Sequence, residues 1–319
     1  MSGPVLLRRA RRLLAPPAAH PWWRSHAQCP TVLELHEALW RVFFAARDAN
    51  NQSHVIYADF DPARDMQLLR LETEPILDLG PPGTFDSAGM GPSAALFVGG
   101  RIFLYYIGIS LRQDVPHQLA IGLAISEDGG ASFRRAAQGP VLSTGPFDPF
   151  FASTPHVAHQ GGVFRMHYMS GAAWERRGDQ FDARYLIKYA RSTDGVSWVT
   201  EDRVALGFAD IAETALARPW VIRRNDGYHM WFCRRGPRSG EPVAEHPYRL
   251  GYARSADGLT WRREDDLLRF ETPPQPGEWD AAMQAYPCVV PYAGNLYLFY
   301  NGDGFGQTGF GFGRVLMPA

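Results

Sequence analysis

The stretch that decides the fold is Ile187-Lys-Tyr-Ala-Arg-Ser-Thr-Asp-Gly-Val-Ser-Trp198, because it occurs in three versions along the chain. The other two are Ile121-Gly-Leu-Ala-Ile-Ser-Glu-Asp-Gly-Gly-Ala-Ser-Phe133 and Leu250-Gly-Tyr-Ala-Arg-Ser-Ala-Asp-Gly-Leu-Thr-Trp261. Each version predicts a strand, a tight Asp-Gly turn and an aromatic residue that opens the next strand, since both turn residues tolerate positive φ. The turn aspartates follow one another at intervals of 66 and 63 residues, which indicates a repeated structural unit.

Five prolines give the same period. They are Pro30, Pro92, Pro155, Pro219 and Pro287, at intervals of 62, 63, 64 and 68 residues, and each precedes a short apolar strand. Radial repetition of four-stranded sheets has this signature, whereas a pair of β-sandwiches would not require an even period along the whole chain. The sequence therefore predicts an all-β fold, a five-bladed β-propeller whose four-stranded antiparallel blades surround a central channel, over residues 21–319.

The last repeat ends about one strand short, after Gly311–Leu316. A ring with an open edge strand invites aggregation, so we expect a segment before Pro30 to supply the missing outer strand. Residues 1–20 are accordingly predicted to be an N-terminal tail that can contribute this strand. Four arginines interrupt the apolar residues of the start, which favours a mobile tail and leaves weak contact with an anionic membrane surface as the alternative.

Composition narrows the classes of function. The 319 residues carry a net charge of −1, and the only basic run is at the N-terminus, so nucleic-acid binding is not expected. Lys188 is the only lysine among 32 basic residues, which a GC-rich genome explains more simply than a need for bidentate arginine contacts. The three cysteines, Cys29, Cys233 and Cys288, are read as small core residues in a reducing compartment. No signal peptide or membrane span is predicted, so the expected location is the cytoplasm.

The segments that lead into the five prolines are where we expect a functional site, because a rigid scaffold brings such loops together on one face. Four of them carry an acid six or seven residues before the proline: Asp86, Asp148, Glu213 and Asp280. Around the propeller axis these acids would form a ring, with His26 and Arg218 among them. Paired carboxylates are what glycosyl transfer needs, one as general acid and one as base or nucleophile. The alternative is that they cap turns, which is favoured for Asp148.

The ends of the second strands place further polar and aromatic groups at the same level. Arg47, Trp174, Arg234 and Asp303 are candidates for substrate contacts, because aromatic faces cover the apolar side of a sugar while charged groups bond its hydroxyls. A packing role is an equal alternative for Trp174. The histidines show no metal-ligand spacing and the glycine-rich stretch at 302–313 lacks a phosphate-loop ending, so no metal site and no cofactor are predicted.

The turns at Ser192–Trp198 and Ser255–Trp261, the strands that follow the prolines and the Leu-Tyr-Leu-Phe-Tyr pattern at 296–300 resemble a known group. They are similar to the arabinanase/levansucrase/invertase-like five-bladed propellers of glycoside hydrolases, and the resemblance covers nearly the whole chain. Closer still is an uncharacterised branch associated with polysaccharide or glycoconjugate biosynthesis, related to the propeller domain of plant inositolphosphorylceramide glycosyltransferases. The hydrolases place catalytic acids where this chain has Cys29, Ser153-Thr154 and Ala217-Arg218, so those acids do not carry over.

Two hypotheses for function follow. The first is a glycosidase-, phosphorylase- or transglycosylase-like enzyme, with Glu213 as general acid and Asp86 or Asp280 as base or nucleophile. The alternative is a non-catalytic propeller that binds a saccharide or a partner enzyme in a glycan biosynthesis pathway. Both imply a saccharide or glycoconjugate as the partner.

Overall fold

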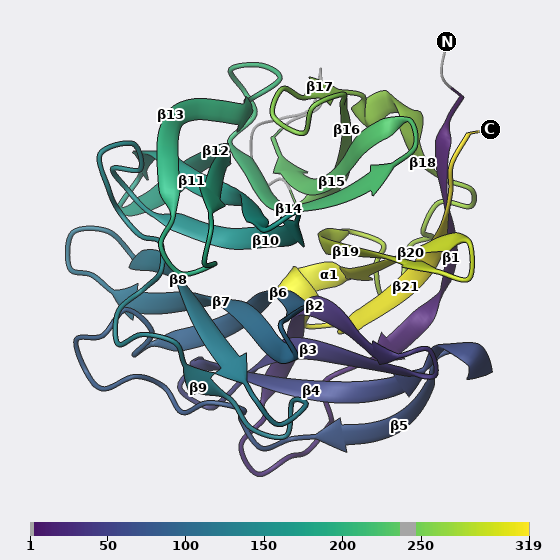
Figure 1. Cartoon of the computed structure of the whole chain (residues 1–319), viewed down its shortest axis with the longest axis horizontal. Helices are drawn as coiled ribbons and strands as arrows, with labels where there is room; N and C mark the ends of the chain where they lie inside the picture. Colours follow the sequence, from purple (N-terminus) through teal and green to yellow (C-terminus); the bar gives the residue numbers. More distant parts are fainter. Residues whose placement is uncertain (1–2, 237–246, 319) are drawn as a thin grey trace.

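The computed structural model describes residues 3–236 and 247–318 and shows a β-propeller, in which antiparallel sheets are arranged around a central channel (Figure 1). One sheet contains β2 (Ser25–His36), β3 (Leu39–Arg47), β4 (Ser53–Asp61) and β5 (Gln67–Glu72). The next contains β6 (Gly89–Val98), β7 (Arg101–Leu111), β8 (His117–Ser126) and β9 (Arg134–Arg135). The prediction of an all-β propeller with four-stranded antiparallel sheets is confirmed.

The middle of the chain forms a sheet of eight strands that divides into two four-stranded groups. One group is β10 (Ala152–Gln160), β11 (Val163–Arg177), β12 (Gln180–Ser192) and β13 (Val199–Leu206). The other is β14 (Ala215–Arg224), β15 (Gly227–Arg235), β16 (Arg249–Ser255) and β17 (Arg262–Arg263). A parallel bridge between Tyr185 and Ala215 joins them, so each group keeps its own antiparallel pairing.

The two ends of the chain share the remaining sheet, whose order is β18 (Leu268–Phe270), β1 (Val5–Leu14), β21 (Phe310–Leu316), β20 (Asn295–Asn301) and β19 (Ala285–Tyr292). Strand β1 pairs antiparallel with β21, and Figure 1 shows the purple N-terminal strand running beside the yellow C-terminal one. Of the two predictions for this segment, a mobile tail and a strand that completes the last sheet, the structure shows the strand for Val5–Leu14. The helices are short: the 3-10 turns η1 (Pro62–Arg64) and η2 (Asp265–Leu267), and α1 (Asp303–Gly306). None of the helices described could span a membrane.

The first strands of the sheets surround the channel. Strand β2 contacts β6, β6 contacts β10, β10 contacts β14, β14 contacts β19, and β19 returns to β2, which closes the ring. Four of these strands have a bulge at the proline, where the preceding residue adopts a left-handed conformation: Cys29 (φ 58°), Thr154 (φ 40°), Arg218 (φ 52°) and Tyr286 (φ 56°). Side-chain-bearing residues rarely adopt this conformation, least of all before proline, so the bulges hold local strain at the channel.

The three Asp-Gly turns lie between the third and fourth strands of their sheets, as the sequence predicts, and they also connect neighbouring sheets. In each turn the aspartate accepts hydrogen bonds from a serine hydroxyl and from backbone N–H groups, as Asp194 does from Ser192 at 2.8 Å and from Val196 at 2.8 Å. The glycine carbonyl of each turn then accepts a hydrogen bond from the second strand of the preceding sheet. The three donors are Arg41 to Gly130 (2.6 Å), Tyr105 to Gly195 (2.7 Å) and His167 to Gly258 (2.9 Å).

Candidate functional site

Three of the predicted acids share one structural arrangement. Asp86, Asp148 and Asp280 are fully buried, and each accepts a hydrogen bond from a tyrosine hydroxyl 20 residues later in the chain. The pairs are Asp86–Tyr106 (2.9 Å), Asp148–Tyr168 (3.0 Å) and Asp280–Tyr300 (2.7 Å). Since the tyrosine lies in the second strand of the same sheet, each pair fastens the loop that enters a sheet to the middle of that sheet.

A cation from the third or fourth strand of the same sheet lies beside each carboxylate. Arg135 of β9 donates to Asp86 at 2.8 Å, and Arg9 of β1 forms two hydrogen bonds with Asp280, at 2.8 and 3.1 Å. The ammonium group of Lys188 in β12 lies 4.0 Å from Asp148. A buried carboxylate needs such partners to remain charged, and all three have them within their own sheet. These contacts favour a structural role for the three aspartates over the predicted ring of catalytic groups.

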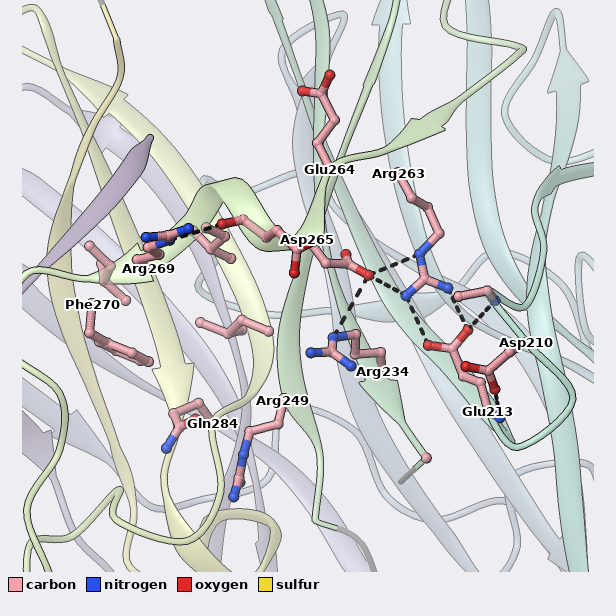
Figure 2. Close-up of a pocket in the computed structure, with 16 residues that line it drawn as sticks. Asp210, Glu213, Arg234, Arg249, Arg263, Glu264, Asp265, Arg269, Phe270 and Gln284 are labelled. Atoms are coloured by element: carbon pink, nitrogen blue, oxygen red, sulfur yellow. Dashed lines mark hydrogen bonds and ion pairs between the residues drawn. The ribbon is translucent and has the colours of Figure 1, made fainter. Parts of the chain in front are cut away.

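Glu213 has the same position before β14, but residue 233, which corresponds to the tyrosine, is a cysteine. Glu213 is instead held by Arg263 of β17, whose Nη2 donates to Oε1 at 2.8 Å, and by the backbone N–H of Ala209 at 2.7 Å. Figure 2 shows Arg263 between Glu213 and Asp265, with Arg234 on the far side of Asp265 at 3.8 Å. These residues line a cavity of about 880 Å³ beside β16 and β18, and we call it the side cavity.

Arg218 is completely buried inside the channel. Its Nη1 donates to the carbonyl oxygen of Pro92 and to Ser93 Oγ, both at 2.9 Å, and its Nη2 donates to Pro30 and to Thr31 Oγ1, at 3.1 and 2.8 Å. The guanidinium thus connects β14 to β2 and β6 across the channel. All these acceptors are neutral, so Arg218 carries a positive charge that no described carboxylate offsets. These contacts favour a structural role for Arg218, which connects three strands, over the predicted contact with substrate.

His26 and Asp303 also have structural partners. His26 is buried and its Nδ1 lies 2.8 Å from Ser25 Oγ; burial and the nearby Arg47 lower the pKa of this imidazole to about 4. Asp303 accepts the backbone N–H groups of Ala282 and Met283 at 2.8 and 2.7 Å, which orders the loop before β19. Neither residue lines the side cavity or the cavity described next.

The mouth of the channel holds a cavity of about 430 Å³, which we call the channel-mouth cavity. Its walls come from every sheet of the ring. Two of the predicted site residues, Arg47 and Trp174, lie in it, and most of the lining was missed by the sequence analysis. The polar and aromatic residues that line it are Gln28, Cys29, Arg47, Asn51, Ser53, His117, Phe151, Ser153, Thr154, Trp174, Phe181, Asp182, Tyr185, Arg235, Tyr248 and Tyr286.

Aromatic rings form one wall of this cavity. The ring of Trp174 is inclined by 72° to that of His117 and by 62° to that of Phe151, with centroids 5.3 and 5.8 Å away. Tyr185 and Tyr248 bond to each other through their hydroxyl groups. Half-buried aromatic faces next to hydroxyl and guanidinium groups suit a ligand that has both apolar and polar sides.

Two arginines supply the positive charge of the cavity. Arg47, at the end of β3, donates only to amide oxygens, those of Gln28 (3.0 Å) and Asn51 (3.0 Å). The guanidinium carbon of Arg235, at the end of β15, lies 5.9 and 5.7 Å from the ring centroids of Tyr185 and Tyr248. The side chain of Arg235 has no hydrogen bond to the residues that the structure describes. Burial opposes its charge, but the neighbouring phenols and Asp182 outweigh burial, and the pKa of Arg235 is raised.

Asp182 is the one carboxylate among the described lining residues. It is half exposed and lies 3.5 Å from Arg177. The position before the first proline is occupied by Cys29, and burial raises the pKa of this thiol, so it stays protonated and cannot act as a base near neutral pH. The cavity therefore lacks a second described carboxylate to pair with Asp182.

The sequence contains a signal for part of what was missed. The constant spacing of 20 residues between aspartate and tyrosine would have identified the three acids as members of a repeated structural pair. No comparable spacing marks Asp182 or Arg235, because their contribution depends on how far the β11–β12 hairpin extends and on where β15 ends.

Known proteins of similar structure share the propeller fold. A glycosyl hydrolase from Bacteroides ovatus superimposes with a TM-score of 0.71 at 14% identity, covering 99% of this chain and 96% of that one. A second structure represents the GH130 family of mannoside phosphorylases, which contains glycoside hydrolases that target β-1,2 mannosidic linkages in Candida mannan. It gives a TM-score of 0.70 at 15% identity, with coverages of 99% and 95%. These identities support the fold alone.

No family model matches the sequence. A relative is found among curated proteins: the uncharacterized protein Rv1502 of Mycobacterium tuberculosis is 37% identical over 306 residues, which cover 95% of this chain and 97% of that protein. Similarity of this extent, over almost all of both chains, shows common descent. The chain belongs to the same family as the uncharacterized protein Rv1502.

Proposed function

We propose that this protein is a carbohydrate-active propeller that binds a saccharide or glycoconjugate in the channel-mouth cavity. The observation that carries the proposal is the lining of that cavity, where Trp174 and tyrosine rings lie beside Arg47, Asp182 and Arg235. Aromatic faces cover the apolar faces of sugars, and charged groups form the strongest hydrogen bonds to hydroxyls. The propeller fold shared with glycosyl hydrolases supports the same class of ligand.

Action on a glycosidic bond is the second candidate, and Asp182 is the observation in its favour. Hydrolysis needs two carboxylates, about 5–5.5 Å apart for retention and about 6.5–9.5 Å for inversion. One general acid is sufficient when a nucleophile other than activated water, such as phosphate, attacks the anomeric carbon. Within this candidate, the described lining therefore favours phosphorolysis or transfer over hydrolysis. A role in polysaccharide or glycoconjugate biosynthesis stays a prediction.

The proposal includes the architecture of the site. We propose that the propeller has five blades, since five first strands contact one another in a closed ring and each begins a four-stranded antiparallel group. In this arrangement every blade contributes at least one residue to the channel-mouth cavity.

A panel of mono- and oligosaccharides, measured by ligand-induced thermal shift and then by calorimetry, tests the binding. For any ligand that binds, Trp174→Ala should weaken the affinity at least about tenfold, because an aromatic face is lost from the centre of the site. Phe97→Ala is the matched control: Phe97 is 46% exposed and lies outside the cavity, so its loss should leave the affinity unchanged. Equal affinities for wild type and Trp174→Ala would contradict the proposed site, and product analysis of each bound ligand then distinguishes binding from reaction.

A further inference from the structure

The charges of the channel-mouth cavity do not balance. At neutral pH its described charged residues are Arg47, Arg235 and Asp182, and Asp182 is already within ion-pair distance of Arg177. His117 adds no charge, because burial lowers the pKa of its imidazole. Charged side chains that leave water are normally paired. Neither guanidinium group forms an ion pair with a described carboxylate, although the charge of Asp182 helps to raise the pKa of Arg235.

Arg218 adds a further positive charge near the cavity. It lies deeper in the same channel, is bound only by carbonyl and hydroxyl oxygens, and its charge acts on Cys29, which lines the cavity. A concave site with walls of low polarity concentrates such a field. The potential in the cavity is therefore positive, although the whole chain has a net charge of −1.

The two lining arginines face a common neighbour. Tyr286 lines the cavity together with Arg47 and Arg235, and its ring centroid lies 5.9 Å from that of Tyr248, the ring that also neighbours Arg235. Tyr286 precedes the proline of β19 in a left-handed conformation, at a φ of 56°. The strained bulge thus adds a tyrosine to the cavity that the two arginines line.

The donors of Arg235 distinguish this site from the side cavity. In the side cavity Arg263 is bonded to both Glu213 and Asp265, so its charge is already matched. The planar fork of Arg235 instead has no described hydrogen-bond acceptor, and its guanidinium carbon lies 5.9 and 5.7 Å from the ring centroids of Tyr185 and Tyr248. Such a fork matches the paired oxygens of a phosphate or a carboxylate.

We propose that the channel-mouth cavity contains an anion subsite, formed by Arg235 and Arg47 with the hydroxyl of Tyr286, that holds the phosphate or carboxylate of an anionic saccharide. This inference rests on the proposed function, since it specifies the ligand of the same cavity. A phosphorylated sugar, a uronic acid, and a neutral sugar bound together with inorganic phosphate would all present the same oxygen pair to the fork.

Calorimetry with inorganic phosphate, and with glucose, mannose, their 1-phosphates and glucuronate, tests the subsite. We expect inorganic phosphate or one of the anionic sugars to bind the wild type, and Arg235→Gln to weaken that binding at least about tenfold, as loss of a charge-assisted bidentate contact does. Arg235→Lys keeps the charge without the fork and should recover only part of the affinity. Arg203→Gln makes the same change at an exposed arginine outside the cavity and should have no effect.

The results also separate this inference from the proposed function. Binding of a neutral sugar that depends on Trp174 but is the same in wild type and Arg235→Gln, with no binding of any anion, would overturn the subsite and keep the saccharide site. Binding of phosphate that depends on Arg235, with no sugar bound, would keep the subsite and overturn the saccharide. If Arg235→Gln lowers the melting temperature, Arg47→Gln provides the second test, with the same expected direction.

Discussion

Asp86, Asp148 and Asp280 differ in sequence context, yet each accepts a hydrogen bond from a tyrosine 20 residues further on and lies beside a cation of the third or fourth strand of its sheet. Each position is therefore defined by these two contacts and not by the acid alone. Where the tyrosine is absent, at Cys233, a longer acid is used and Arg263 replaces the missing bond. Sequence reasoning located these acids correctly at the entrances to the sheets. It missed the tyrosines, although their constant spacing is visible, and it could not show the cations, because these lie 40 to 271 residues away in the chain at no constant spacing.

Replacing Asp280 by Asn tests this structural role. The change leaves Arg9 facing a neutral amide, and breaking a buried ion pair costs about 3–5 kcal/mol. We expect the free energy of unfolding, measured by urea titration, to fall by about that amount, while the exposed Asp179→Asn control changes it by less than about 0.5 kcal/mol. A variant as stable as the wild type that has lost activity on an identified substrate would instead support the catalytic role that the sequence predicted.

The three cysteines provide a second test at single residues. All are buried and free, and burial raises the pKa of the thiols, that of Cys288 to about 12. Because the thiolate is the reactive form, iodoacetamide at pH 8 should leave the native protein unmodified and label all three cysteines after unfolding. Intact-mass spectrometry measures this, and rapid labelling of Cys29 in the native protein would show that the channel is more open than the structure indicates.

Two buried histidines predict how stability depends on pH. Burial lowers the pKa of His156 to about 3 and that of His167 to about 4, so both are neutral in the folded protein, whereas the unfolded chain protonates them below about pH 6.5. The stability that they contribute is complete above pH 6.5 and is lost as the pH falls towards 4. Urea unfolding from pH 7 to pH 4 should therefore show a smaller decrease in His156→Phe than in the wild type. The exposed His36→Phe is the control, and an unchanged slope in His156→Phe would contradict the assignment.

At the level of elements, the Asp-Gly turns have two functions, since they end a hairpin and also bond the neighbouring sheet. The sequence predicted the hairpin from Asp and Gly alone, because that preference is local. It did not predict the bonds from Arg41, Tyr105 and His167 to the glycine carbonyls, since three different donor types leave no pattern to recognise. The bulges at the prolines were missed for a related reason: the prolines are visible, but the left-handed residues before four of them, Cys29, Thr154, Arg218 and Tyr286, have different side chains.

Gly195→Ala tests the contact between sheets. An added Cβ would lie 2.8 Å from the hydroxyl of Tyr105 and 3.0 Å from the ring of Phe164, at a φ of 76°. Gly178→Ala is a matched control, because its φ is 61° and nothing lies within 4 Å of its Cβ. Both changes incur the left-handed strain of about 1–2 kcal/mol, but only Gly195→Ala must also displace the neighbouring sheet. Thermal unfolding should show a clearly lower midpoint for Gly195→Ala than for Gly178→Ala, and equal midpoints would contradict the contact.

At the level of the whole molecule, the N-terminus supplies a strand of the last sheet. Strand β1 pairs with β21, and its Arg8 and Arg9 bond Glu271, Glu278 and Asp280. Two of the basic residues that suggested a tail at the membrane surface, Arg8 and Arg9, thus form ion pairs with acids of the last sheet and the loop before it. The period of the sequence was sufficient to predict the propeller. The channel-mouth cavity was not predictable, because its lining combines single residues from several sheets whose side chains meet only after the ring has closed.

Deletion of residues 1–14 tests the closure. Loss of β1 exposes the edge of β21 and leaves Asp280 without Arg9, so the melting temperature should fall strongly and the protein should aggregate more readily. Deletion of residues 1–4, which precede β1, is the control and should leave the melting temperature within a few degrees of the wild type. An unchanged melting temperature after removal of residues 1–14 would show that β1 does not stabilise the ring.

The central claim is that the ligand binds at the channel mouth, and a crystal structure of the protein with the tightest ligand from the saccharide panel tests it most directly. The structure predicts a sugar ring against Trp174, with an anionic group of the ligand, or a phosphate beside it, within hydrogen-bond distance of Arg235. Density for the ligand in the side cavity of Glu213 and Arg234, or on an outer face of the propeller with the channel mouth empty, would contradict the account.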